Sequence, residues 1–432
     1  MNMCEPLNGD SVLHLRARRN DFKELQYSIR NGVVDELNNR GETPLMVAAQ
    51  NSAACITLSL LKRGADPNSQ DNDGNTPLHH GVLASSHRIV AVLRRYNADV
   101  NIPNNDGKTP LHLAAEINST DIISKLAKST FTLDTTVRSK TGETALISAV
   151  KRGLVRTVRH FMKSNFEDSA DDEGKTALHW ACTFSNPTVV KLLITTNNIE
   201  HRDNNGLTPL ATAVLANNAL AFDILYRSSA NLYTRDSTGD TLLHMACRLD
   251  NVNILKHLVS CDLYPHNEPQ NFKKETPMHT ACKVGSFRSF TYLLSLDHSV
   301  SAIDDLGRTP LMIAIANNSI DVAAAILNAP ASELNPVNIN SKDAGGNTAL
   351  HYCSMYDNVR IASMLLNRGA SLHELNLAGY SPCTMLSQFS DPLHSAVYQQ
   401  VYVPHLADGS LDQLLFDVDI SEFMWDQIFD FP

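Results

Sequence analysis

Short apolar stretches alternate with polar turns along most of the chain, and the alternation has a fixed period. A typical unit begins with a glycine, one variable residue and a threonine, followed by an apolar run such as PLHLAA in residues 110–115. Gaps of 32 to 39 residues separate the successive threonines, which are Thr43, Thr76, Thr109, Thr144, Thr176, Thr208, Thr241, Thr276, Thr309 and Thr348. Weaker copies at Ser11 and Ser381 extend the series to about twelve units, up to about residue 390.

The pattern within a unit predicts two short helices after a turn. Thr109 has the side chain of an N-cap, Pro110 falls at the first helical position, and His112 falls where a side chain reaches back to the cap. The second helix is seen in residues 56–61 of another unit, where apolar residues recur at helical spacing. Gly64 then predicts the left-handed residue that ends this helix.

One such helix pair has too little apolar surface to form a core alone, so it needs a stacked neighbour. The T-P-L-H-x-A motif at this period resembles the ankyrin repeat. The resemblance implies an all-α fold, a solenoid of stacked helix-turn-helix units. We expect a capping repeat in residues 1–40, the solenoid in 41–390, and an acidic amphipathic tail with short helices in 391–432.

Composition is typical of a soluble protein of the cytoplasm or nucleus. Apolar residues make up 43% of the chain and charged residues 19%. No apolar run is long enough to span a membrane, and the first residues lack the pattern of a signal peptide. Four of the eight cysteines occupy small-residue positions of the repeat, which predicts reduced core thiols; they are Cys182, Cys247, Cys282 and Cys353.

Recurring histidines raise the question of a metal or catalytic site. They take the same position in seven units and are His14, His79, His112, His179, His244, His279 and His351. Each lies next to its own capping residue on a different helix, so we interpret them as structural. His80 adjoins His79, but neighbouring helical residues point apart and do not share a metal. No phosphate-binding, nucleophile-elbow or zinc-protease motif occurs, so we expect no enzyme activity, cofactor or metal.

The net charge of −10 is concentrated at the C-terminal end. No lysine or arginine follows Arg368, whereas nine acidic residues do. The rest is nearly neutral, so we expect no direct nucleic-acid binding. Residues 15–23 are locally basic, which fits either a polar capping repeat or a docking site for an acidic partner.

The tail favours two short amphipathic helices in residues 408–432. Capping patterns precede two apolar stripes, which include Leu414, Leu415, Phe423, Trp425, Ile428 and Phe429. Helices this short need a surface to lie against. That surface is either the last repeat, which makes the tail an intramolecular cap, or a groove of another protein.

The ankyrin resemblance implies a concave surface that binds one or more proteins, with turns projecting as fingers. Carried over, the variable residue before each threonine becomes a partner-binding candidate: Glu42, Asn75, Lys108, Glu143, Lys175, Leu207, Asp240 and Arg308. Two irregular segments, before Thr276 and before Thr348, are candidates for specificity or tolerated loops.

These features predict a monomeric scaffold or adaptor that binds a client on the concave surface and a second protein through the tail. DAGGNTALHYC and LAGYSPCTML also resemble the last repeats of IκB-like proteins, which implies a regulator of Rel-type transcription factors as an alternative. A second alternative is a substrate receptor of a ubiquitin ligase, although residues 386–432 align convincingly with neither an F-box-like nor a SOCS-box module.

Overall fold

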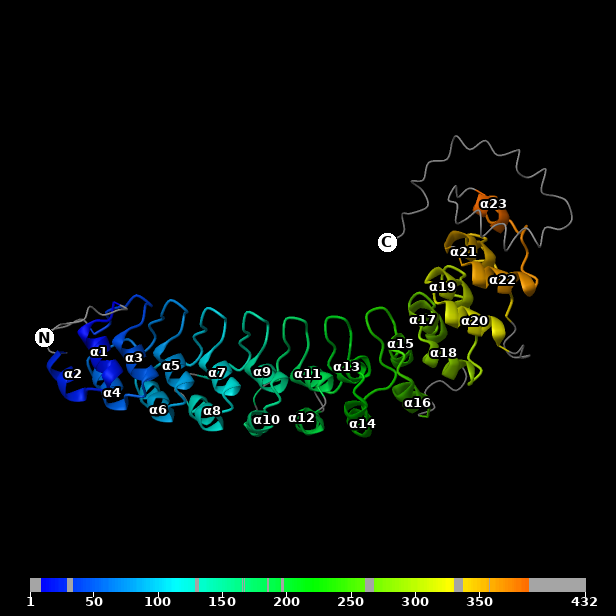
Figure 1. Cartoon of the computed structure of the whole chain (residues 1–432). Coiled ribbons are helices and arrows are strands. Elements are labelled where there is room, and N and C mark those ends of the chain that lie inside the picture. The colour runs from blue at the N-terminus through cyan, green and yellow to red at the C-terminus, as the bar shows by residue number, and fades with distance from the viewer. Residues whose placement is uncertain are drawn as a thin grey trace. The chain divides into compact units, whose positions relative to one another are not determined.

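The computed structural model contains helices, joined by turns and loops, in the part of the chain that it describes (Figure 1). The described residues are 9–28, 34–128, 132–164, 166, 168–184, 186–195, 198–260, 268–329, 337–356 and 358–387. They fall into two compact units, residues 1–237 and 238–432, which we treat separately.

Helices come in pairs, as the repeat pattern predicts. The first helices of the first unit are α1 (Val12–Arg19), α3 (Pro44–Gln50), α5 (Pro77–Leu83), α7 (Pro110–Glu116), α9 (Ala145–Lys151), α11 (Ala177–Thr183) and α13 (Pro209–Leu215). Its second helices are α2 (Phe22–Ser28), α4 (Ala54–Lys62), α6 (His87–Arg95), α8 (Thr120–Ala127), α10 (Val155–Lys163), α12 (Pro187–Leu193) and α14 (Ala219–Arg227). We call the first helices inner and the second helices outer. In Figure 1 the outer helices of this unit form one row and the inner helices another.

The second unit continues the same alternation. Its inner helices are α15 (Leu242–Arg248), α17 (Pro277–Val284), α19 (Pro310–Ala316), α21 (Ala349–Tyr356) and α23 (Pro382–Ser387). Its outer helices are α16 (Val252–Ser260), α18 (Phe287–Leu294), α20 (Ile320–Asn328) and α22 (Val359–Asn367). The twelve described inner helices agree with the repeat number expected from the sequence.

Inner helices begin where the capping residues predict. Helix α7 starts at Pro110, with Thr109 in extended backbone geometry as its N-cap. The Nδ1 atom of His112 accepts from the Thr109 backbone N–H at 3.2 Å. The prediction that His112 reaches back to the cap is therefore confirmed. Gly64, with a φ of +87°, follows α4 as expected.

Each of the seven repeat histidines also joins its repeat to the next. Because a backbone N–H of the cap donates to Nδ1, the ring proton lies on Nε2. From His79, Nε2 donates to the carbonyl of Lys108 at 2.9 Å, and from His279 to that of Arg308 at 3.1 Å. Equivalent bonds run from His14, His112, His179, His244 and His351. Burial lowers the pKa of His79 to about 4, so this ring is neutral at physiological pH. The structural interpretation of the histidines agrees with these contacts.

The turns before the inner helices project as fingers that hydrogen bond in series. In the first unit, the N–H of Asn105 donates to the carbonyl of Asp73 at 2.9 Å, and that of Lys140 to Asp106 at 2.8 Å. Gly107 sits in this ladder with a φ of +72°, and a Cβ there would lie 2.8 Å from the Lys140 nitrogen. The glycine of the repeat is therefore required both by its backbone angle and by the next finger.

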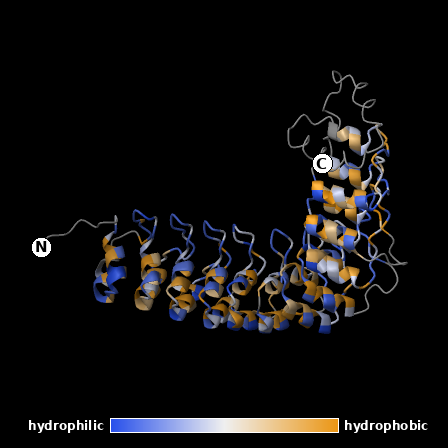
Figure 2. Ribbon diagram, turned by 45° about the vertical axis from the view of Figure 1, so that its right-hand side comes forward, coloured by the Kyte–Doolittle hydropathy of each residue, from blue (hydrophilic) through white to orange (hydrophobic). Residues whose placement is uncertain are grey.

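The core lies between the helix rows, where apolar residues face each other (Figure 2). Ile56, Leu60 and Leu61 of α4 are buried as expected, while Leu58 is only half-buried. The four cysteines at small-residue positions are buried, and burial raises the pKa of the Cys182 and Cys247 thiols. They fill the core as the sequence indicated.

Both irregular segments fall partly outside the described residues, at 261–267 and 330–336. Beside the first, Lys274 takes the place of the usual glycine with a φ of +55°. Its N–H donates to the carbonyl of Asn271 at 3.0 Å, so the finger keeps its turn without the glycine.

Candidate protein-binding site

We call the surface formed by the inner helices and the fingers the inner face. Trp180 of α11 has the largest side chain on this face of the first unit. It lies four residues after the capping Thr176, and its ring nitrogen donates to Oδ2 of Asp171 at 2.7 Å. The other oxygen of Asp171 accepts from the N–H groups of Glu173 and Lys175. One carboxylate therefore holds both the finger and the indole ring in place.

Two lysines lie against the Trp180 ring. The Nζ of Lys151, from the preceding inner helix, is 3.6 Å from the ring centre, and that of Lys175 is 5.0 Å away. Lys151 also pairs with Glu143 at 2.8 Å, and Lys175 with Glu173 at 2.7 Å. Each cation–π contact contributes roughly 0.5–1 kcal/mol at an exposed site. The indole is thus presented in a fixed orientation between cations.

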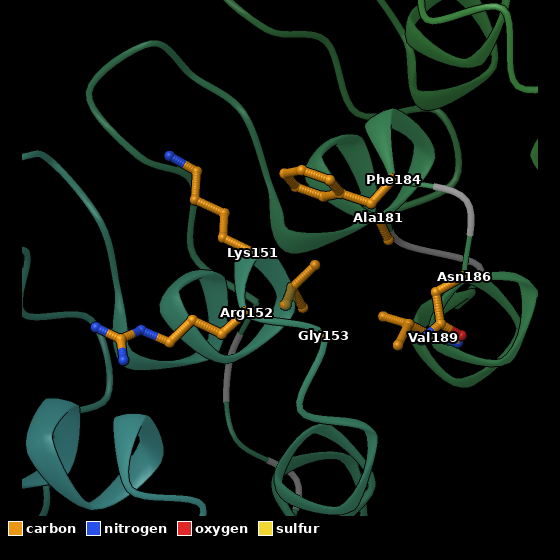
Figure 3. A pocket seen from close by; sticks show the side chains of 8 residues that line it. Lys151, Arg152, Gly153, Ala181, Phe184, Asn186 and Val189 are labelled. Carbon is orange, nitrogen blue, oxygen red and sulfur yellow. Dashed lines mark hydrogen bonds between the residues drawn. The ribbon is translucent and has the colours of Figure 1, made fainter.

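A hollow of about 200 Å³ opens beside this cluster, between the repeat of α9 and that of α11 (Figure 3). Its apolar walls include Val150, Ala181, Phe184 and Val189. Phe184, directly after α11, remains 40% exposed. Figure 3 shows Phe184 and Val189 facing the end of α9 across the hollow. An exposed aromatic ring at the edge of an apolar hollow is typical of a contact point for a partner.

The rim of the hollow is charged. Lys151 and Arg152 lie on the α9 side, and Nη2 of Arg152 is 3.3 Å from Glu116, which also accepts from Lys108 at 2.8 Å. Burial opposes ionisation of Glu143, but hydrogen bonds from Lys151 and Ser148 outweigh it and lower its pKa. The cations of these pairs remain accessible, with 26–52% of each side chain exposed, so an incoming carboxylate can reach them.

The structure places the eight candidate finger residues unequally. Six are half-buried at the base of the fingers, and several pair with the inner helix that follows. Glu42 and Asp240 are buried, at 4% and 3% exposure. Asn38 donates to Glu42 at 2.8 Å, and Asn271 to Asp240 at 2.8 Å. Glu42 and Asp240 therefore offer little side-chain surface for contact with a partner.

Sequence reasoning missed the inner-helix residues, namely Trp180, Phe184, Lys151, Arg152 and Glu116. The available signal was the variable position of the T-P-L-H-x-A motif, four residues after each threonine, which holds the large side chain of Trp180 in this repeat. Partner binding by the finger candidates stays a prediction. The predicted tail contacts lie outside the described residues; they are Leu414, Leu415, Phe423, Trp425, Ile428 and Phe429.

A family model of ankyrin repeats in three copies matches the chain over residues 1–71, 52–138, 131–203, 195–268, 261–338 and 300–376. Together with the stacked helix pairs, this match shows that the chain belongs to the ankyrin-repeat family. Ankyrin repeats are protein-interaction modules. Among the described helices, none has the length and apolar character needed to cross a bilayer.

Several known proteins are similar to part of the chain. Rabankyrin-5 of Mus musculus is 34% identical over 152 residues, which cover 34% of this chain and 13% of that protein. The B-cell lymphoma 3 protein homolog of Mus musculus is 27% identical over 212 residues, covering 46% of this chain and 45% of that protein. The crystal structure of the ankyrin repeat domain of Bcl-3, titled a unique member of the IkappaB protein family, matches with a TM-score of 0.47 and 26% identity. It covers 50% of this chain and 99% of that chain. The chain spans less than half the length of these two curated relatives.

Proposed function

We propose that this chain is a non-enzymatic scaffold or adaptor of the cytoplasm or nucleus that binds a client protein across its inner face. The observation that carries the proposal is the cluster of Trp180, Phe184 and their lysine neighbours beside the apolar hollow. Its chemistry fits a client segment with a large apolar side chain flanked by carboxylates. The apolar side chain would enter the hollow. The carboxylates of the client would replace Glu116 as the partner of Arg152 and Glu143 as the partner of Lys151.

A double substitution tests this binding site. Trp180→Ala with Phe184→Ala removes the two aromatic rings, and Phe22→Ala with Tyr27→Ala removes two exposed rings from outer helix α2 as a matched control. Clients found by affinity purification are purified and titrated against each full-length variant. We expect the inner-face variant to weaken binding at least about tenfold, because aromatic anchors often account for 2 kcal/mol or more. Equal affinity of both variants for every client would contradict the proposal.

We also propose that the segment 408–432 recruits a second protein. Its alternation of acidic and bulky apolar residues supports this role. Removing the chain beyond about residue 400 should eliminate a set of partners without changing the thermal melting curve. Loss of the melting transition with all partners retained would instead indicate an intramolecular cap.

A second candidate function is regulation of Rel-type transcription factors. The resemblance of DAGGNTALHYC and LAGYSPCTML to the last repeats of IκB-like proteins supports it, beside the 27% identity to the B-cell lymphoma 3 protein homolog. Binding of a purified Rel-homology domain to the full chain, lost in the Trp180→Ala and Phe184→Ala variant, would favour this function over a general scaffold.

A further inference from the structure

The outer helices of the first unit carry a positive charge that the net charge of the chain conceals. Helices α4, α6, α8 and α10 together contain eight lysines and arginines but one acidic residue, Asp121. We call these eight residues the basic outer row; they are Lys62, Arg88, Arg94, Arg95, Lys125, Arg156, Arg159 and Lys163. Residues 1–237 as a whole hold 26 basic and 25 acidic residues, so the charge is segregated rather than in excess.

The basic outer row has no carboxylate partners within the described part of the chain. Six of its members are exposed, and Arg94 and Lys125 are half-buried. On the inner face, by contrast, Lys108, Lys151 and Arg152 each pair with a glutamate. The inner face thus neutralises its own cations, whereas the outer row leaves them available.

Helix stability accounts for only part of the basic outer row. Five of its members lie in the last turns of their helices, where the helix dipole favours a cation; they are Lys62, Arg94, Arg95, Lys125 and Lys163. Arg88 and Arg156 are each the second residue of a helix, where the positive end of the dipole disfavours a cation. Like charges on adjacent helices also repel one another, and a bound anion would offset this repulsion.

The row is continuous because the four helices pack side by side in chain order (Figure 1). Arg94 donates to the carbonyl of Lys128 at the end of α8, and Ser124 of α8 lies 3.0 Å from Nε2 of His160 on α10. Packed helices lie 8–10 Å apart, so four of them span roughly 30 Å. An extended polypeptide crosses this distance with about ten residues.

We propose that the basic outer row is a docking surface for an acidic polypeptide segment of a partner protein. Charge complementarity defines the partner, and two observations favour a polypeptide over other polyanions. The unit has almost no net charge, whereas nucleic-acid-binding domains are strongly basic overall. No large hydrophobic side chain is exposed on these four helices, so the row offers neither a tryptophan, tyrosine or phenylalanine for bases to stack on nor an anchor for a lipid bilayer.

Charge reversal on the full chain tests the surface. One variant combines Arg88→Glu, Arg95→Glu, Arg156→Glu and Arg159→Glu. The control variant makes the same change in charge on other outer helices, with Lys191→Glu, Arg227→Glu, Arg288→Glu and Arg360→Glu. The probes are a fluorescein-labelled oligoglutamate, a labelled DNA duplex and phosphatidylserine vesicles, each titrated at low ionic strength.

We expect the oligoglutamate to bind the unaltered chain and the control, and to bind the row variant at least about tenfold more weakly, equivalent to about 1.4 kcal/mol. Binding should also weaken as added salt shortens the screening length. Equal weakening in both variants would show a general charge effect and overturn the proposal. Failure of the oligoglutamate to bind, or tighter row-dependent binding of the duplex or the vesicles, would also overturn it.

Far-ultraviolet circular dichroism establishes that both variants fold. A neutral version with glutamine at the same four row positions repeats the comparison if the reversed variant is unstable. The result is independent of the inner-face cluster, because Trp180 and Phe184 are unchanged in all these variants.

Discussion

The hydrogen bond from His79 to the next repeat predicts that replacing His79 changes the free energy of unfolding in a direction that depends on pH. His79→Met removes the Nε2–H that donates to the carbonyl of Lys108. The preceding repeat already contains a methionine at this position, Met46, whose sulfur accepts from the capping N–H of Thr43 at 3.3 Å. The substitution therefore mainly removes the contact between repeats.

At neutral pH the substitution should destabilise the chain by about 1 kcal/mol. The carbonyl of Lys108 loses the donor from His79 but still accepts from the Asn104 N–H at 2.9 Å, so the change removes one hydrogen bond, which contributes about 0.5–1.5 kcal/mol. In the unaltered chain, burial lowers the pKa of His79 from 6.5 to about 4, so the contribution of His79 to stability depends on pH. Between these values the unfolded chain takes up a proton that the folded chain does not.

The unaltered chain consequently loses about 1.4 kcal/mol of stability for each pH unit below 6.5, reaching a total of about 3 kcal/mol near pH 4. The His79→Met variant lacks this loss. Their difference in unfolding free energy should therefore shrink with acidification, vanish near pH 6, and favour the variant at lower pH.

Urea unfolding followed by circular dichroism, at pH 7.5 and pH 4.5, measures the two differences. Met46→Leu serves as the control, since it changes the same position of the neighbouring repeat without a titrating group. Its effect should be the same at both pH values. A His79→Met effect that is equally independent of pH would refute the conclusion that the buried ring is held neutral.

Three further predictions concern single positions. Asn271→Asp places a third carboxylate against the buried carboxylates of Asp240 and Glu275, and should lower the free energy of unfolding by about 3 kcal/mol in urea titrations at pH 7. Asn104→Asp is the control: it faces the neutral amide of Asn75 and should cost less than about 1 kcal/mol. Gly107→Ala should destabilise the chain by at least about 2 kcal/mol more than Gly153→Ala in the same assay. Both glycines have a positive φ, but only at Gly107 would the added Cβ collide with the backbone of the next finger. Cys55 should react with iodoacetamide before the other described cysteines, because it alone among them is exposed. Mass spectrometry measures the order of labelling, and simultaneous labelling of the other cysteines would contradict their burial.

The sequence by itself determined the repeat, the helix pairs and their starting residues. These features depend on local chemistry, such as the Thr109 cap, the proline that follows it and the regular apolar spacing, and they recur often enough to be read from one chain. The role of His112 at the cap was predictable for the same reason, because its partner lies only three residues away.

Tertiary structure decided what each repeated position does for its neighbours. No sequence pattern indicates that the histidine rings also bond to the next repeat, or that Lys151 reaches the ring of Trp180 from the preceding inner helix. It also concealed the burial of Glu42 and the gathering of cations on four outer helices. These properties join residues about 30 positions apart, and stacking of the repeats is what brings such residues into contact.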